Sequence, residues 1–360
     1  MSIDPTALVI ALSLCGIGLV YLSSAAPSTS FVVRQAVFLF AGLVAFSAMY
    51  TVHYSNWTRY AWILYAAGIA SLIAVAIVGT RVNGAKSWFS IGSIRIQPAE
   101  FMKIATLLFL ARHLSIGDGA KKFSGLLTAS ALVGVPMLMI AIQPDFGSAL
   151  AFVPMAAGAI WIAGVKKRYV AAVLLIGLLT ASFGYVFLLK DYQKQRIEAW
   201  LNPDAFSKTT AYQTAQARIA IGSGRLSGKG LNQGTHHKLK YLPERHTDMI
   251  FAVVSEEGGF VMSGLIVSLF FALFLYGILT AYRTRDPAGR MIAVLAASLL
   301  TGQAIINIGV CNGLVPVTGI ALPFLSYGGS SLLSSWMAVG LLANVASRRK
   351  VWLGADGVSG

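Results

Sequence analysis

Apolar residues run through this chain in long unbroken stretches, which are separated by short segments of Gly, Pro or charged residues. A helix needs about 20 consecutive apolar residues to cross a hydrocarbon layer about 30 Å thick. Windows of roughly that size predict about ten membrane-spanning helices. They cover residues 6–26, 31–51, 60–78, 99–111, 124–142, 147–165, 169–189, 249–281, 291–311 and 326–346.

These stretches are continuous and do not alternate apolar with polar residues, as the strands of a membrane barrel would. The composition agrees, because 56% of the residues are hydrophobic and 11% are charged, against about 45–50% and about 25% in soluble domains. Soluble enzymes, disordered proteins, coiled coils and collagens are excluded. We therefore predict an all-α polytopic membrane protein, with residues 1–360 forming a single integral membrane domain. Cys15 and Cys311 lie in apolar stretches and are interpreted as small buried hydrophobes.

The distribution of Lys and Arg predicts the orientation, because short cytoplasmic loops carry an excess of both. With a cytoplasmic N-terminus, the inner segments hold Arg59, Arg112, Lys121, Lys122, Lys166, Lys167, Arg168, Arg283, Arg285, Arg290, Arg348, Arg349 and Lys350. The short outer loops hold Arg34, Arg81, Lys86 and Arg95. Both termini are therefore predicted to be cytoplasmic, with one large extracytoplasmic loop between spans seven and eight, at about residues 190–248.

That outer loop is rich in basic residues and contributes to a formal net charge of +15. Nucleic acid is not expected outside a cell, so an anionic substrate that is extracellular or carried by a lipid is the better candidate partner. The inner basic clusters are interpreted as ordinary topology signals that face anionic membrane lipids.

Ionisable residues at the rim of a membrane span are costly and are therefore candidates for function. Glu100 and Lys103 share one face of a helix that follows Pro98, either as a helix-dipole and i,i+3 pair or as a holder for an anionic group. Asp145 and Asp248 each precede a predicted span, so each is either a helix N-cap or a functional carboxylate.

Three further features belong to the part of the protein that is predicted to lie at the outer side of the membrane. Glu256 and Glu257 lie deep enough in span eight that at least one should face the protein interior and find a partner. The glycines between residues 222 and 234 fit no nucleotide-binding spacing and indicate a mobile surface loop. Residues 312–331 are apolar but rich in Gly and Pro, which indicates irregular backbone lining a cavity, such as a re-entrant segment.

Four segments together resemble the SEDS family (shape, elongation, division and sporulation). They are NGAKSW through QPAEFMK at residues 83–103, QPDFGSA at 143–149, LPERHTDMIFA at 242–252, and PVTG through PFLSYGGSS at 316–331. The resemblance spans essentially the whole chain and is greatest to the elongation member, with the division member second.

The resemblance implies a peptidoglycan glycosyltransferase of the bacterial cytoplasmic (inner) membrane, with its active site on the extracytoplasmic side. Such proteins polymerise lipid II, an undecaprenyl-diphosphate-linked precursor, into a growing glycan strand, and they work with a class B penicillin-binding protein. The family's essential aspartate matches Asp248, which we expect to act as a general base or as the ligand of a divalent cation, Mg²⁺ or Mn²⁺.

The developing charge on the diphosphate requires cations, for which Lys103, Arg81, Lys86 and Arg245 are the candidates. Glu100 and Asp145 are placed as supporting carboxylates. The prenyl chains are expected to lie in lipid-facing grooves between spans. Two alternatives are a flippase or transporter for a lipid-linked precursor and a non-catalytic scaffold for the penicillin-binding protein.

Overall fold

The computed structural model describes residues 4–82, 85–92, 94–116, 123–172, 175, 177, 191–206, 211–235, 242 and 244–355. The first helices are α1 (Thr6–Ala25), α2 (Thr29–Thr51), α3 (Tyr54–Arg59), α4 (Ala61–Val78), α5 (Pro98–Ser115), α6 (Phe123–Ile142), α7 (Phe146–Leu150) and α8 (Phe152–Ile162). They are followed by α10 (Asp191–Leu201), the short 3₁₀ helix η2 (Pro203–Phe206), α11 (Tyr212–Ser223), α13 (Ile250–Arg283), α14 (Pro287–Cys311) and α15 (Gly329–Ala355). The strands are β1 (Thr80–Val82), β2 (Ala85–Ile91) and β3 (Ile94–Ile96).

Seven of the described helices are long and apolar enough to cross a membrane, namely α1, α2, α4, α6, α13, α14 and α15. They confirm seven of the predicted spans. A helix suits this environment because it pairs its backbone N–H and C=O groups internally, where hydrocarbon offers no partner. The chain is thus a mostly helical, multi-pass membrane protein.

The other three predicted spans have different outcomes. Residues 99–111 belong to α5, which begins at Pro98, a residue suited to the first turn. Residues 147–165 form two consecutive helices, α7 and α8, instead of one. Residues 169–189 fall mainly outside the described part of the chain, so that span stays a prediction.

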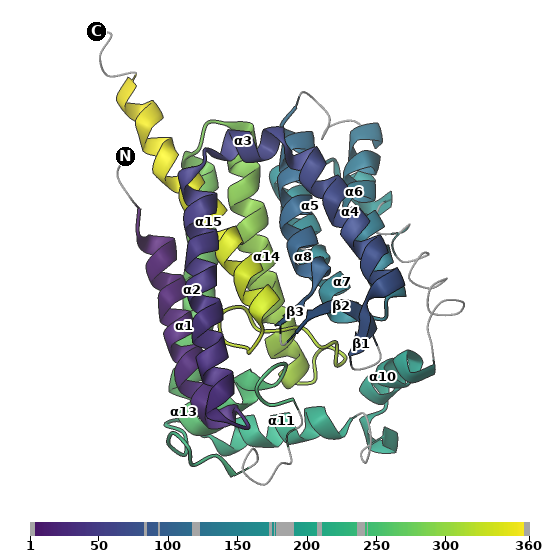
Figure 1. Ribbon diagram of the computed structural model, residues 1–360, viewed down its shortest axis with the longest axis vertical. Coiled ribbons are helices and arrows are strands. Elements are labelled where there is room, and N and C mark those ends of the chain that lie inside the picture. The colour runs from purple at the N-terminus through teal and green to yellow at the C-terminus, as the bar shows by residue number, and fades with distance from the viewer. Residues whose placement is uncertain are drawn as a thin grey trace.

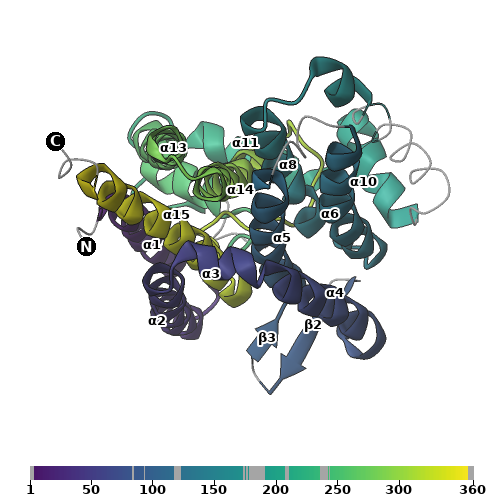
Figure 2. The same ribbon diagram turned by 90° about the horizontal axis from the view of Figure 1, so that it is seen from above.

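The core of the bundle lies around α5, α14 and α15 (Figure 2). The apolar windows of α14 and α15 are each 78% buried inside the protein, whereas those of α2 and α4 are 17% buried and leave most of their surface for lipid. Both Cys15 and Cys311 are buried free thiols, as predicted. The polar residues of α5 are therefore enclosed by protein and not by lipid.

A small antiparallel sheet follows α4, where the sequence predicted only an outer loop. The strand order is β1-β2-β3, with Arg81 opposite Lys86 and Phe89 opposite Ile96. The two ladders satisfy backbone groups that a loop of this length would leave to water. The sheet leads directly into Gln97 and α5.

The start of α1 and the end of α15 lie at one end of the bundle, while α10 and α11 cross the opposite end (Figure 1). This arrangement agrees with predicted termini on one side and a large loop on the other. We call the end with α10, α11 and the sheet the loop end of the bundle.

Helix α13 is broken near its start, although the sequence predicted one continuous span over residues 249–281. Gly259 has φ 67° and ψ −164°, which only glycine adopts readily. Residues 224–230 pack directly against this break, because the Gly228 and Gly259 backbones touch. The predicted surface location is confirmed, because Leu226 and Leu231 are exposed, while backbone contacts join the segment to α13; its predicted mobility stays a prediction.

Candidate functional site

Asp248 lies at the loop end of the bundle, two residues before α13 begins. The sequence allowed it to be a helix cap, but the N-cap residue of α13 is Met249 and no side chain caps this helix. The backbone carbonyl of Asp248 accepts a hydrogen bond of 2.8 Å from Asn307 Nδ2 on α14. The main chain is therefore anchored while the carboxylate is not used for capping.

The Asp248 carboxylate lies against the backbone of Gly319, whose φ is 75°. It is partly buried, and no hydrogen bond or ion pair joins it to another of the described residues. A carboxylate that is neither a cap nor half of an ion pair is available for chemistry.

Asp145 is the N-cap of α7, as one of the two predicted readings required. It accepts a hydrogen bond of 3.2 Å from Ser148 N. A second bond of 2.5 Å comes from Nε2 of Gln97, whose same nitrogen lies 3.0 Å from Ser148 Oγ. Gln97 was not among the predicted site residues, although it directly precedes Pro98 in a segment that carries the family resemblance.

The two aspartates approach the same irregular segment from different elements. A Cβ on Gly147, in the turn after Asp145, would lie 2.6 Å from the carbonyl oxygen of Thr318. Only a glycine at 147 permits this contact. The carboxylate of Asp248 lies beside the next residue, Gly319. Residues 318 and 319 thus lie between the start of α7, which Asp145 caps, and the carboxylate of Asp248.

The electrostatics of the pair follow from this arrangement. The pKa of Asp248 is raised to about 7, chiefly by burial and further by the negative charges of Glu244 and Asp145, while Arg196 opposes the rise. Burial also raises the pKa of Asp145, against hydrogen bonds from Ser148 and Gln97 that stabilise its charged form. Asp248 is therefore poised to exchange a proton near neutral pH.

Arg196 comes from α10 and was not among the predicted site residues. Its Nη1 donates to the carbonyl oxygen of Val317 at 3.4 Å, and Trp200 Nε1, one turn later, donates to the carbonyl oxygen of Gly313 at 3.0 Å. Helix α10 is thereby tied to the segment that contacts Asp248. No local pattern distinguishes Arg196 from the other basic residues of the large loop.

The segment between α14 and α15 is irregular, as predicted. Residues 312–328 contain no helix or strand. Leu322, Phe324 and Leu325 within it are buried, and Gly18 of α1 packs against the backbone of residues 324 and 325. Non-helical backbone in a membrane protein is tolerated where protein surrounds it or where it lines a cavity.

Lys103 and Glu100 form a buried ion pair in α5. Lys103 Nζ lies 2.7 Å from Glu100 Oε2, which also accepts 2.6 Å from Ser334 Oγ on α15. The i,i+3 pairing is confirmed. Lys103 is only 1% exposed, so its ammonium is occupied and enclosed by protein. Its role as a diphosphate ligand stays a prediction that requires displacement of Glu100.

The other predicted cations lie elsewhere at the loop end. Arg81 and Lys86 face each other across β1 and β2, and Lys86 Nζ donates to the carbonyl oxygen of Ile77 at 2.5 Å. Arg245 Nε donates to the carbonyl oxygen of Ala25, the last residue of α1, at 2.8 Å. None of the described contacts joins these three side chains to Asp248, so their roles stay predictions.

The donor set does not fit a preformed metal centre. Within the described ranges, no group of three or more His, Cys, Asp or Glu side chains is placed to hold a metal ion. The positive charge of Arg196 acts on the Asp248 carboxylate and would repel a divalent cation bound there.

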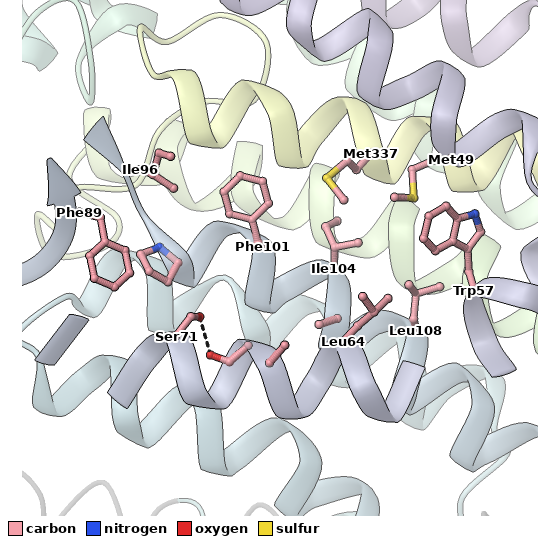
Figure 3. A pocket seen from close by; sticks show the side chains of 14 residues that line it. Met49, Trp57, Leu64, Ser71, Phe89, Ile96, Phe101, Ile104, Leu108 and Met337 are labelled. Carbon is pink, nitrogen blue, oxygen red and sulfur yellow. Dashed lines mark hydrogen bonds between the residues drawn. The ribbon is translucent and has the colours of Figure 1, made fainter. Parts of the chain in front are cut away.

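An apolar groove of about 380 Å³ runs between α4 and α5 and reaches the sheet (Figure 3). Phe89, Ile96 and Phe101 line one end, and Trp57, Leu108 and Met49 line the other. Such a lining suits a hydrocarbon chain and not a sugar or a phosphate.

Comparison with known proteins gives consistent matches over the full length. The family model for FtsW, RodA and SpoVE, described as cell cycle protein, matches residues 5–351. Stage V sporulation protein E of Bacillus subtilis is 38% identical over 95% of this chain and 96% of its own. A probable peptidoglycan glycosyltransferase FtsW of Geobacter metallireducens is 35% identical (95% and 93% covered), and the peptidoglycan glycosyltransferase MrdB of Escherichia coli is 33% identical (97% and 95% covered).

Solved structures agree in fold. A chain from a study of how a peptidoglycan synthase complex coordinates polymerization and crosslinking superimposes with a TM-score of 0.81, at 28% identity over 97% of this chain and 99% of that chain. Rod shape determining protein RodA of Thermus thermophilus gives a TM-score of 0.72 at 26% identity, covering 97% and 98%. The matches include a sporulation protein, an FtsW protein and a rod shape determining protein, so the greater resemblance to the elongation member than to the division member stays a prediction.

Proposed function

Because the chain belongs to the family of FtsW, RodA and SpoVE, the SEDS proteins, we propose that it is a peptidoglycan glycosyltransferase that polymerises lipid II into glycan strands for the cell wall and cell shape. The observation that carries the chemistry is the Asp248 carboxylate, which is partly exposed and without a described partner. Its pKa is raised to about 7, chiefly by burial. A base with a pKa near the working pH is the most effective general base.

In the proposed reaction, Asp248 takes the proton of the acceptor sugar hydroxyl. The oxygen of that hydroxyl attacks the anomeric carbon of the donor at the same time. The new C–O bond forms while the bond to the diphosphate breaks, and the lipid diphosphate leaves with the electron pair. One base suffices for a direct displacement that inverts the anomeric centre. General-base assistance of this kind contributes roughly 10²–10⁴-fold.

The leaving diphosphate gains negative charge and requires a cation. Arg196 is a candidate for this cation, because it lies close enough to Asp248 to lower the pKa of that carboxyl. Its planar guanidinium suits two phosphate oxygens at once. Lys103, Arg81, Lys86 and Arg245 remain the further candidates, and Glu100 and Asp145 the supporting carboxylates. A divalent cation at Asp248 would need its remaining ligands from substrate and water, and chelation by EDTA during turnover tests it.

The surroundings proposed for this activity follow from the same family. The apolar groove beside α4 and α5 offers space for a prenyl chain at the loop end, where the sheet meets it. We place the loop end on the extracytoplasmic side of the bacterial inner membrane, with both termini cytoplasmic. The partner would be a class B penicillin-binding protein, and the whole chain would act as one integral membrane domain.

The test is polymerisation of purified lipid II by the full chain in detergent. Asp248→Asn should fold normally and form no polymer, because the amide keeps the shape of the side chain but is not a base. The matched control is Asp286→Asn, which alters the cap of α14 at the far end of the bundle. Wild-type synthesis by Asp248→Asn would overturn the assignment. Movement of lipid II across vesicles without polymer would favour a flippase, and activity only in a partner protein would favour a scaffold.

A further inference from the structure

The break at Gly259 divides α13 into a short outer half, residues 250–258, and a long inner half. Asp248 lies two residues before the outer half, and Glu256 and Glu257 lie near its end. Both glutamates are buried, 0% and 2% exposed, which confirms the prediction that at least one of them faces the interior. The outer half is therefore a short rod with the proposed base at one end and two enclosed carboxylates at the other.

Residues 224–235 form hydrogen bonds with the second end of this rod, near Glu256 and Glu257. On the outer side of the break, Lys229 N and Gly230 N donate to the carbonyl oxygens of Glu256 and Glu257, each at 3.0 Å. On the inner side, Phe260 N donates to the carbonyl oxygen of Arg225 at 2.9 Å. The segment thus takes over backbone groups that the break removes from the helix ladder.

Glycine makes this contact possible. A Cβ on Gly224 would lie 1.9 Å from the carbonyl oxygen of Ser255, and one on Gly228 would lie 2.1 Å from that of Glu257. Backbone cannot yield to such an approach. Gly224 and Gly228 therefore serve close packing against α13 and not the binding of a phosphate.

Side chains complete the grip on Glu256. Its Oε1 accepts 2.6 Å from Lys229 Nζ, 2.8 Å from Thr235 N and 3.0 Å from Thr235 Oγ1. Lys229 Nζ also donates to Thr235 Oγ1 at 2.8 Å. At the same level, Ser24 Oγ of α1 donates to Glu257 Oε1 at 2.6 Å. A carboxylate bound by a cation and two further donors holds its backbone firmly in place.

The first end of the rod is held through its backbone carbonyl groups, which accept hydrogen bonds from two side chains. Asn307 Nδ2 bonds the carbonyl oxygen of Asp248 at 2.8 Å, and Ser326 Oγ bonds that of Thr247 at 2.7 Å. No described residue bonds the Asp248 carboxylate itself. The position of that carboxylate therefore depends on the backbone of the rod, which is fixed by these two bonds at one end and through Glu256 at the other.

We propose that residues 224–235 are a positioning clamp for Asp248, in which Lys229 and Thr235 hold Glu256 and thereby set where the carboxylate meets the acceptor hydroxyl. This inference rests on the proposed function of Asp248. Lys229, Thr235 and Glu256 are positioning residues, because none of them touches the reacting atoms. A displacement of about 1 Å at a reacting group is enough to lower the rate about a hundredfold.

The clamp is tested by steady-state kinetics with purified lipid II and the full chain. Thr235→Val removes the hydroxyl bond but keeps the backbone bond, and Lys229→Met removes the cation. Both should lower kcat about ten- to a hundredfold, with KM within about twofold of wild type, because substrate contacts are unchanged. Lys229→Arg should restore most of the activity. Lys167→Met, an exposed lysine beyond α8, is the matched control.

A lysine that pairs with a buried carboxylate also affects folding, so a second variant is needed. Lys229→Met/Glu256→Gln leaves no uncompensated charge, and the glutamine amide oxygen can still accept from Thr235; its loss in kcat should be smaller than the sum of the two single losses. Hydrogen–deuterium exchange should increase at residues 247–252 in Thr235→Val. Wild-type kcat in both the Thr235 and Lys229 variants, or losses that only follow the amount of folded protein, would overturn the clamp. A wild-type chain that makes no polymer would instead overturn the proposed function.

Discussion

The Asp248 carboxylate packs against Gly319, where a Cβ would lie 3.5 Å from Oδ2 of the aspartate. Gly319 adopts a φ of 75°, in the left-handed region. The irregular segment between α14 and α15 therefore presents bare backbone to the proposed base. A side chain at position 319 would therefore contact the proposed base directly.

Gly319→Ala is expected to reduce polymerisation more than it reduces stability. The left-handed conformation costs a non-glycine residue about 1–2 kcal/mol, and the new methyl group also touches the base. Gly92→Ala, in the turn between β2 and β3, is the control, because its φ is 61° and its Cβ would meet nothing within 4 Å. Both variants should lose similar stability in thermal unfolding, but only Gly319→Ala should lose kcat. Equal activities would contradict the role of Gly319.

The rate should rise with pH through about 7, since only the ionised form of Asp248 accepts a proton and its pKa is raised to about 7. Arg196→Gln should move the midpoint to higher pH, because the Arg196 charge lowers the pKa. Glu244→Gln should move it to lower pH, because the Glu244 charge raises the pKa. The pH profile of kcat/KM measures these shifts. Midpoints that stay together in all three proteins would assign the titration to another group.

Asp248→Asn should stabilise the fold at pH 8. The raised pKa means that the folded protein resists ionisation of this carboxyl, so the stability that Asp248 contributes is present below its ordinary pKa of 3.8 and is lost as the pH rises to about 7. Asparagine avoids that loss, which is about 2–4 kcal/mol. Thermal unfolding should show equal stabilities at pH 4 and a more stable variant at pH 8. A less stable variant at pH 8 would show that the charged form is favoured.

Lys103→Met should reduce folded protein more than turnover per folded molecule. It leaves the buried Glu100 carboxylate without its cation, and breaking such a pair costs about 3–5 kcal/mol. Lys103→Met/Glu100→Gln should recover most of this stability, since the glutamine amide oxygen can still accept from Ser334. Unfolding temperature and kcat are measured on the same preparations. A double variant that is stable but inactive would return Lys103 to the diphosphate site.

The spans were predictable because a run of apolar residues is itself the physical requirement for crossing a membrane. The break at Gly259 was not predictable, since it depends on residues 224–230, which pack there only in the folded chain. The sheet after α4 was likewise not predicted, because a short charged segment between two spans is also typical of an outer loop. Local patterns identify helices, whereas contacts between distant segments decide where they bend.

The candidate site likewise contains residues that the sequence could predict and residues that it could not. Asp248 and Asp145 emerged from rare charges at span ends and from the family resemblance. Gln97 and Arg196 carry no such signal, because a polar residue before a proline and an arginine in a basic loop are ordinary features. For Lys103 the spacing indicated the correct partner, Glu100, but spacing does not report that both side chains are enclosed.

The enclosed ion pair of α5 has a consequence for biogenesis. Charged side chains resist transfer from the translocon into lipid by about 2.5–3.5 kcal/mol each at the centre of a helix and by less towards its ends, and Glu100 and Lys103 lie in the first two turns of α5. Ser334, which binds Glu100, is synthesised more than two hundred residues later, on the last helix. Helix α5 therefore reaches its final packing only after α15 has been synthesised.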